Sequence, residues 1–141
     1  MVISFSSLGI VTWLNQFGGM YPNPTLAFNT ANPGDLIISG AALTDYGGTT
    51  GFQLYGTAST GYNGITGEYS PSGSQLWLSM LGGGGSDPSY SGNLIQTASG
   101  TIFAMGLTQG RLQSTLYGTH AVTDLFIAKF NLASSGSAGL Q

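Results

Sequence analysis

Hydrophobic residues occur along the chain in short runs of four to six positions, separated by clusters of Gly, Pro, Asn, Asp and Ser. Runs of this length, rich in Ile, Leu, Phe and Trp and bounded by turn-forming residues, are typical of β-strands. No window carries an apolar stripe at i, i+3, i+4 and i+7 over three turns, and Gly, which costs a helix about 1 kcal/mol, interrupts the densest apolar stretches. The pattern therefore predicts an all-β protein with little or no helix.

The pattern also repeats along the chain. WLNQFGG at 13–19 is matched by WLSMLGG at 77–83, and GDLIISG at 34–40 is matched by GTIFAMG at 100–106. Two further pairs follow in the same order: LYGT at 54–57 and 116–119, and ITGEYS at 65–70 with FIAKFN at 126–131. Conserved order with drifting spacing is what tandem duplication followed by loop insertion and deletion would leave.

We predict a single domain over 1–141, with repeat one at about 7–70, repeat two at about 71–131 and a C-terminal tail at 132–141. Each repeat reads as four short antiparallel strands with glycines at the turns, which is typical of a propeller blade; the alternative is a β-sandwich or jelly roll. A propeller needs about four blades to close, so two blades predict completion of the ring by other copies. Three chains would form a six-bladed ring, and a homotrimer is favoured.

Three segments of the second repeat carry a resemblance to a known family. GSQLWLSMLGGGGSD at 73–87, ASGTIFAMGLT at 98–108 and TDLFIAKFN at 123–131 together resemble one unit of the bacterial and archaeal β-propeller repeats called SBBP repeats. The first repeat keeps Trp13 but has NGITGE at 63–68 where the family has Asp-x-Phe-x-Ala-Lys. The resemblance implies a propeller fold and a surface or secreted setting without known catalysis.

Charge is scarce, which excludes several partners. Only 5% of residues are charged, against roughly 25% in ordinary soluble domains. The two basic residues, Arg111 and Lys129, cannot form a phosphate-neutralising patch, so nucleic acid and anionic membranes are excluded as partners. The chain has no cysteine, hence no disulfide or thiolate metal site.

The chain carries no visible address to a membrane or a secretion route. No stretch reaches the roughly 18 apolar residues that span a membrane, so membrane insertion is not expected. Residues 1–19 lack the basic region and sustained apolar region of a signal peptide. We expect either a mature form or a protein that leaves the cell without a signal, as a virion component released by lysis would. An extracellular, cell-surface or virion location is predicted.

The four glycines of GGGGSDPS at 82–89 raise the question of a ligand loop. A phosphate loop needs a following Lys and a helix, and neither is present. A calcium loop needs several converging oxygen ligands, and Asp87 has only Ser86 and Ser89 beside it. The same place in repeat one holds GGMYPNP at 18–24. A simple turn is favoured, and we expect no cofactor and no metal.

Catalytic residues are equally sparse. His120 is the only histidine, the corresponding position is Ala58, and no Gly-x-Ser-x-Gly elbow accompanies it. The acidic residues are scattered and assigned to turns, and no pair has a spacing that suggests joint acid and base catalysis: Asp35, Asp45, Glu68, Asp87 and Asp124. We therefore expect a protein that is not an enzyme.

The aromatic residues divide into two groups. Those inside predicted strands are assigned to the core: Trp13, Phe17, Tyr69, Trp77, Phe103, Phe126 and Phe130. Those assigned to turns form a candidate carbohydrate site together with neighbouring acids: Tyr21, Tyr46, Tyr62, Tyr90, Asp45 and Asp87. Loop tyrosines can stack on sugar rings, although they can equally cover loop backbone or contact a second subunit.

Two functions are compatible with these features. The first is a non-enzymatic structural or assembly protein of an exposed particle or surface, such as a virion decoration or tail component or an extracellular filament, with its own copies and other capsid or surface proteins as partners. The second is a lectin-like adhesion module that binds glycans. Residues 2–6 resemble the strands at 67–70 and 128–131, which suggests that a terminal strand completes the sheet of a neighbouring copy.

Overall fold

The computed structural model describes residues 1–16, 24–43, 52–57, 61–83, 89–109, 112, 122–132 and 138–140. They contain eleven strands: β1 (Val2–Phe5), β2 (Val11–Asn15), β3 (Thr25–Phe28), β4 (Leu36–Ala42), β5 (Phe52–Thr57), β6 (Asn63–Tyr69), β7 (Gln75–Gly83), β8 (Ser89–Gln96), β9 (Ile102–Thr108), β10 (Asp124–Leu132) and β11 (Ala138–Leu140). No helix occurs in these described ranges. The predicted all-β class is confirmed.

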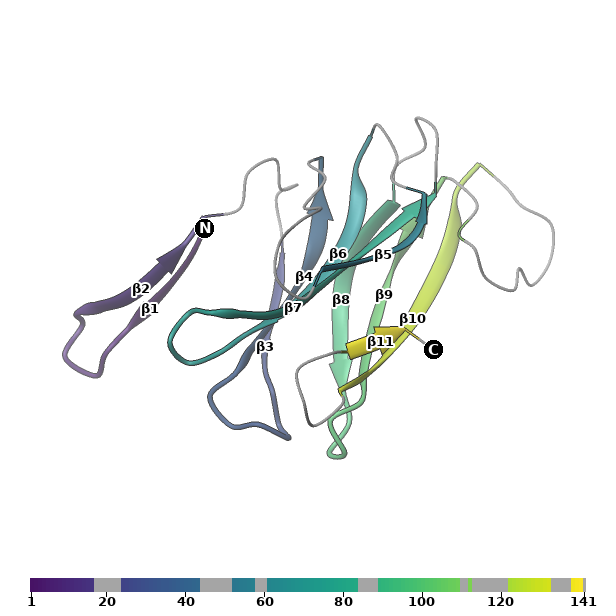
Figure 1. Ribbon diagram of the computed structural model, residues 1–141. Helices are drawn as coiled ribbons and strands as arrows, with labels where there is room; N and C mark the ends of the chain where they lie inside the picture. The colour runs from purple at the N-terminus through teal and green to yellow at the C-terminus, as the bar shows by residue number, and fades with distance from the viewer. Residues whose placement is uncertain are drawn as a thin grey trace.

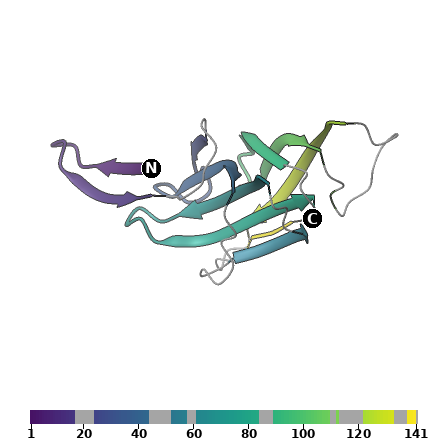
Figure 2. The ribbon, with the colours of Figure 1, turned by 90° about the horizontal axis from the view of Figure 1, so that it is seen from above.

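The strands form three separate sheets (Figure 1). The hairpin sheet contains β1 and β2, the first sheet has the order β3-β4-β6-β7-β5, and the second sheet has the order β8-β9-β10-β11. All neighbouring strands are antiparallel except β5, which runs parallel to β7. None of the sheets closes on itself, and the hairpin sheet and β10 lie toward opposite ends of the molecule (Figures 1 and 2).

The first and second sheets share one strand register. Ile37 of β4 pairs with Glu68 of β6, and Phe103 of β9 pairs with Lys129 of β10, at the positions that the sequence repeat aligns. The other pairs of β3, β4 and β6 match those of β8, β9 and β10 in the same way. Strand β7 joins the first sheet although it opens the second sequence repeat. The first sheet is thus assembled across the boundary of the sequence repeats.

The β1–β2 hairpin has the same construction as the β6–β7 hairpin. Ser4 pairs with Trp13, Glu68 pairs with Trp77, and both hairpins have an irregularity directly after the first residue of this pair. Every pair of the shorter hairpin has a counterpart 64 residues later. The N-terminal hairpin therefore supplies a further copy of the β6–β7 strand pair of the first sheet.

One turn type joins three of the hairpins, at 6–10, 70–74 and 97–101. In each, the first residue receives a backbone hydrogen bond from the fourth and donates one to the fifth, at 2.8 to 3.0 Å. The fourth residue is a glycine with φ of 76°, 83° and 84° respectively, a left-handed conformation that favours glycine. The first residue is Ser or Thr, whose hydroxyl accepts a backbone N–H of the same turn. The sequence signals Ser-x-x-Gly and Thr-x-x-Gly therefore set these turns.

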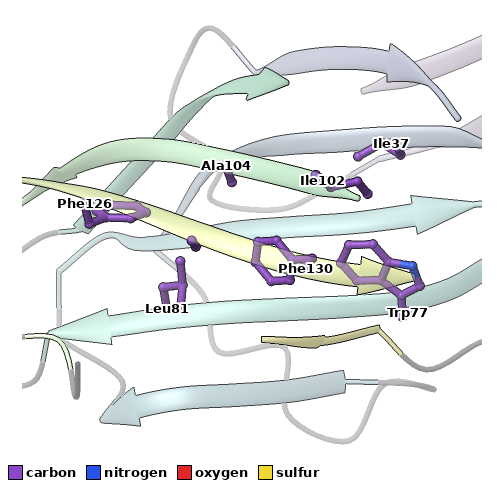
Figure 3. Close-up of a cluster of buried hydrophobic side chains, with 8 residues drawn as sticks. Ile37, Trp77, Leu81, Ile102, Ala104, Phe126 and Phe130 are labelled. Carbon is purple, nitrogen blue, oxygen red and sulfur yellow. The ribbon is translucent and has the colours of Figure 1, made fainter. Parts of the chain in front are cut away.

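The larger of the two core clusters in the described residues lies between the first and second sheets (Figure 3). It contains Ile37, Trp77, Leu81, Ile102, Ala104, Phe126, Ala128 and Phe130. The rings of Trp77 and Phe130 stack with centroids 5.7 Å apart. Burial of the predicted core aromatics Tyr69, Trp77, Phe126 and Phe130 is confirmed. Trp13 and Phe103 are only half-buried, because the faces to which they belong are not fully covered, and Phe17 lies outside the described residues.

Candidate functional site

Most of the predicted carbohydrate site falls outside the described residues. This applies to Tyr21, Tyr46, Asp45 and Asp87, and also to His120. Among the candidate site residues, only Tyr62 has a described side chain; it is half-buried directly before β6. The carbohydrate site therefore stays a prediction.

The assignment of Tyr90 to a turn is wrong. Tyr90 lies in β8 and pairs with Leu107 of β9. Aromatic residues favour a pleated strand when a neighbouring strand offers a partner, and β9 provides one here. Its place in a strand weakens the reason for grouping Tyr90 with loop tyrosines.

The assignment of Glu68 to a turn is also wrong. Glu68 lies in β6 and is only 3% exposed. Its two carboxylate oxygens accept hydrogen bonds from Asn29 Nδ2 and from Trp77 Nε1, the latter at 2.6 Å. A buried carboxyl group is tolerated because donors replace its lost hydration. The match of 67–70 with residues 2–6 and 128–131 already treated Glu68 as part of a strand, and the structure supports that assignment over the turn.

The structure brings Glu68 close to Asp35, a pairing that sequence spacing did not suggest. Burial raises the pKa of Glu68, the hydrogen bonds from Asn29 and Trp77 oppose that rise, and the charge and hydrogen bond of Asp35 add to it. Asp35 directly precedes Leu36, which pairs with Tyr69, and this register explains the meeting of the two carboxyl groups.

The same polar cluster joins the two large sheets. Asn29 Oδ1 accepts a hydrogen bond from Gln96 Nε2 at 2.8 Å, and the Thr30 backbone N–H donates to Gln96 Oε1 at 2.9 Å. Thr30 Oγ1 also donates to the Thr97 carbonyl at 3.1 Å. Because both oxygens of Glu68 are engaged and the group is buried, the cluster fits a structural tie between sheets rather than an acid that meets a substrate.

The described residues contain neither a candidate metal cluster nor a membrane-spanning helix. No group of three or more His, Cys, Asp or Glu residues gathers in the described part of the chain. Within those same ranges, no helix has the length and apolarity to cross a membrane. The remaining candidate surfaces are apolar.

The second sheet turns an apolar row away from the core, which we call the outer face. It consists of Ile95 of β8, Phe103, Met105 and Leu107 of β9, and Leu125 and Ile127 of β10. The charged Lys129, which pairs with Phe103, lies at one end of the same side. Leu107 pairs with Leu125 and Met105 with Ile127, so these side chains are cross-strand neighbours on one side of the sheet. Leu125 is 64% exposed and Ile127 is 65% exposed.

The equivalent positions of the first sheet are buried although they are more polar. Thr66 corresponds to Ile127 and is 1% exposed, and Ser39 corresponds to Met105 and is fully buried. Gly64, the counterpart of Leu125, is buried too. We call this row, with Ile37 and Glu68, the covered face; the second sheet packs against it. The more apolar copy of the same face is therefore the one left exposed.

A second exposed apolar row lies on the hairpin sheet, and we call it the hairpin face. It consists of Ile3, Phe5 and Leu14, with Ile3 paired to Leu14. Phe5 is 58% exposed and Leu14 is 50% exposed. At the position of Phe5, the first sheet has Tyr69 and the second sheet has Phe130, and both of these are buried.

The opposite side of the hairpin sheet is attached to the first sheet. Trp13 Nε1 donates to the Pro71 carbonyl at 2.8 Å, and Asn15 Nδ2 donates to the Gly73 carbonyl at 2.7 Å. A Cβ on Gly73 would lie 2.8 Å from ring atoms of Trp13, so glycine permits this close approach. The attachment holds the hairpin with its apolar row outward.

No family model matches the chain, and no curated protein matches it. The resemblance to SBBP propeller repeats stays a prediction.

Proposed function

We propose that the protein is a non-enzymatic assembly protein whose copies associate through the outer face of the second sheet, as part of an exposed particle or surface. The observation that carries this proposal is the contrast between the two faces. Ile127 is 65% exposed while its counterpart Thr66 is 1% exposed. A contiguous exposed apolar row marks an interaction site, whereas single exposed apolar residues need no explanation.

A propeller-like ring of three copies is the assembly that best suits this surface. Packed β-sheets in a repeated register supply blade-like units, and ring closure would cover a face that a single chain leaves open. A virion or extracellular surface is the proposed setting, since the chain has only 5% charged residues and an abundance of Gly. The carbohydrate-binding function is not favoured by any described contact.

The test is the mass of the protein in solution by light scattering at micromolar concentration. We expect about three times the chain mass of 14.4 kDa for the wild type, and the monomer mass for Ile127→Glu, because a carboxylate cannot be buried in an apolar contact without a partner. Val122→Glu is the matched control, since Val122 is 84% exposed and lies outside the row. A monodisperse wild-type monomer would refute the proposal.

A further inference from the structure

The two large sheets pack against each other through faces that are not equivalent by register. The covered face of the first sheet packs against the side of the second sheet that is opposite the outer face. That side presents Ile102, Ala104, Phe126, Ala128 and Phe130. These are the alternate residues of β9 and β10, so each strand turns one set toward the first sheet and the other set into the outer face. A stack of such sheets has two different ends.

Two of the equivalent faces are exposed in a single chain. One is the outer face of the second sheet, which is equivalent to the covered face by register. The other is the hairpin face of the hairpin sheet, which is joined to the first sheet at the 70–74 turn. The hairpin face is equivalent to the side of the second sheet that packs on the first: Phe5 takes the place of Phe130, and Ile3 takes the place of Ala128. The chain therefore exposes one copy of each partner of an interface that it already forms internally.

We infer that the hairpin face of a second copy occupies the outer face of the second sheet, so that copies associate head to tail. This inference rests on the proposed function and names the partner of the same surface. The internal interface supports this pairing, because Phe130 and Ala128, the equivalents of Phe5 and Ile3, share one core cluster with Ile37, the equivalent of Phe103. Such a contact joins two different surfaces, and therefore forms a closed ring or an open chain rather than a symmetric pair.

The chemistry of the two surfaces agrees with this pairing. The hairpin face offers the uncharged Ile3, Phe5 and Leu14 to the apolar side chains of the outer face, whose one charged residue in the described strands, Lys129, lies beside Phe103. A two-stranded hairpin is marginally stable alone in water, so packing against a second sheet would also stabilise it.

Complementation between two charge variants tests the inference. Phe5→Glu damages the hairpin face and leaves the outer face intact, whereas Ile127→Glu does the reverse. We expect each variant alone to be a monomer, and an equimolar mixture to form a dimer of about 29 kDa, twice the 14.4 kDa chain, and nothing larger, because only one intact interface can form. Sedimentation velocity measures this mass directly.

Three further variants keep the result interpretable. Leu8→Glu changes the same hairpin at an 83% exposed turn position and should keep the wild-type mass. Leu14→Glu should behave as Phe5→Glu does, because it lies on the same face of the partner strand. Val122→Glu should also keep the wild-type mass. Circular dichroism and thermal unfolding confirm that each monomeric variant remains folded.

The outcomes separate the two proposals. If Phe5→Glu keeps the wild-type mass while Ile127→Glu is monomeric, the outer face is an interface but its occupant is another surface, such as the outer face of a second copy, and the inference is overturned. If both variants are monomeric but the mixture does not dimerise, the inference is also overturned. If the wild type itself is monomeric, the proposed function fails first.

Discussion

The covered face of the first sheet and the outer face of the second sheet have the same register and opposite environments. The buried copy contains Ser39, Thr66 and Glu68, and each of these polar side chains forms a hydrogen bond. Ser39 Oγ lies 3.2 Å from Thr66 Oγ1, and Glu68 accepts hydrogen bonds from two donors. The exposed copy replaces them with Met105, Ile127 and Lys129.

The difference shows that burial follows from what packs against a face and not from its hydrophobicity alone. A polar face can be buried when its hydrogen bonds are satisfied inside the chain. An aliphatic face has no such requirement and can be covered by any apolar surface of matching shape. The outer face is therefore suited to a contact between molecules, and the covered face to a fixed contact within one.

The largest expected effect separates Phe130 from its counterpart Phe5. In the monomeric Ile127→Glu background, Phe130→Ala should lower the free energy of unfolding by about 3–5 kcal/mol, because it removes a buried ring that stacks on Trp77. Phe5→Ala, at an exposed position, should cost less than about 1 kcal/mol in the same background. Urea unfolding measures both losses, and equal losses would contradict the predicted difference in burial between these two equivalent positions.

The next effect concerns the carboxyl group on the covered face. Because the pKa of Glu68 is raised in the folded protein, the folded state holds its proton at pH values where the unfolded chain has lost it. Stability should therefore fall as the pH rises from the ordinary pKa of a glutamate to the raised value, by about 1.4 kcal/mol for each unit of the rise.

Glu68→Gln isolates this contribution. The amide has one acceptor oxygen for the two donors of Asn29 and Trp77, so we expect a loss of about 1–3 kcal/mol at acid pH. The fall of stability with pH should become shallower than in the wild type. Urea unfolding between pH 4 and 8 provides the comparison, and an unchanged slope would show that Glu68 does not titrate in this range.

A smaller effect distinguishes two glycines in equivalent turns. Gly9→Ala and Gly73→Ala both place Ala at a positive φ, which costs about 1–2 kcal/mol. A Cβ on Gly73 would also collide with Trp13, whereas nothing lies within 4 Å of a Cβ on Gly9. Gly73→Ala should therefore be the more damaging, and should increase hydrogen exchange across β1 and β2. The same exchange in both variants would mean that the Trp13 contact does not hold the hairpin.

The smallest effect is expected at Ser79 on the covered face. Its hydroxyl is buried and has no hydrogen-bond partner among the described residues. Ser79→Ala should leave stability unchanged or raise it by up to about 1 kcal/mol, whereas Ser39→Ala should lower stability by about 1 kcal/mol because it removes bonds to Thr66 and Ile65. Thermal unfolding of the two variants compares a satisfied with an unsatisfied hydroxyl, and a loss at Ser79 would reveal a partner.

Strand content and turns were predictable because they depend on local signals. Apolar runs between glycine-rich clusters predict strands, and Ser70 and Thr97 begin turns whose glycines are needed for a positive φ. The aligned motifs also predicted equivalent strands, since Trp13 and Trp77 occupy equivalent pairs.

The membership of each sheet and the buried carboxyl cluster were not predictable in this way. Strand β7 pairs with β6 through the local turn at 70–74, whereas a division of the chain into repeats at residue 71 assigned β6 and β7 to different units. Asp35 and Glu68 are 33 positions apart, and only the pairing of β4 with β6 brings them together. Likewise, the exposure of Ile127 depends on what lies against the second sheet and not on the residues of β10.

The most direct measurement of the outer face as an interface is thiol reactivity at a single introduced cysteine, since the chain contains none. Ile127→Cys replaces an apolar residue of the row with a small apolar one, and Val122→Cys provides an exposed reference on the same protein. We expect Ile127→Cys to react with a maleimide many-fold more slowly than Val122→Cys at micromolar concentration, and at the same rate after dilution to the monomer. Equal rates at both concentrations would contradict burial of the outer face between copies.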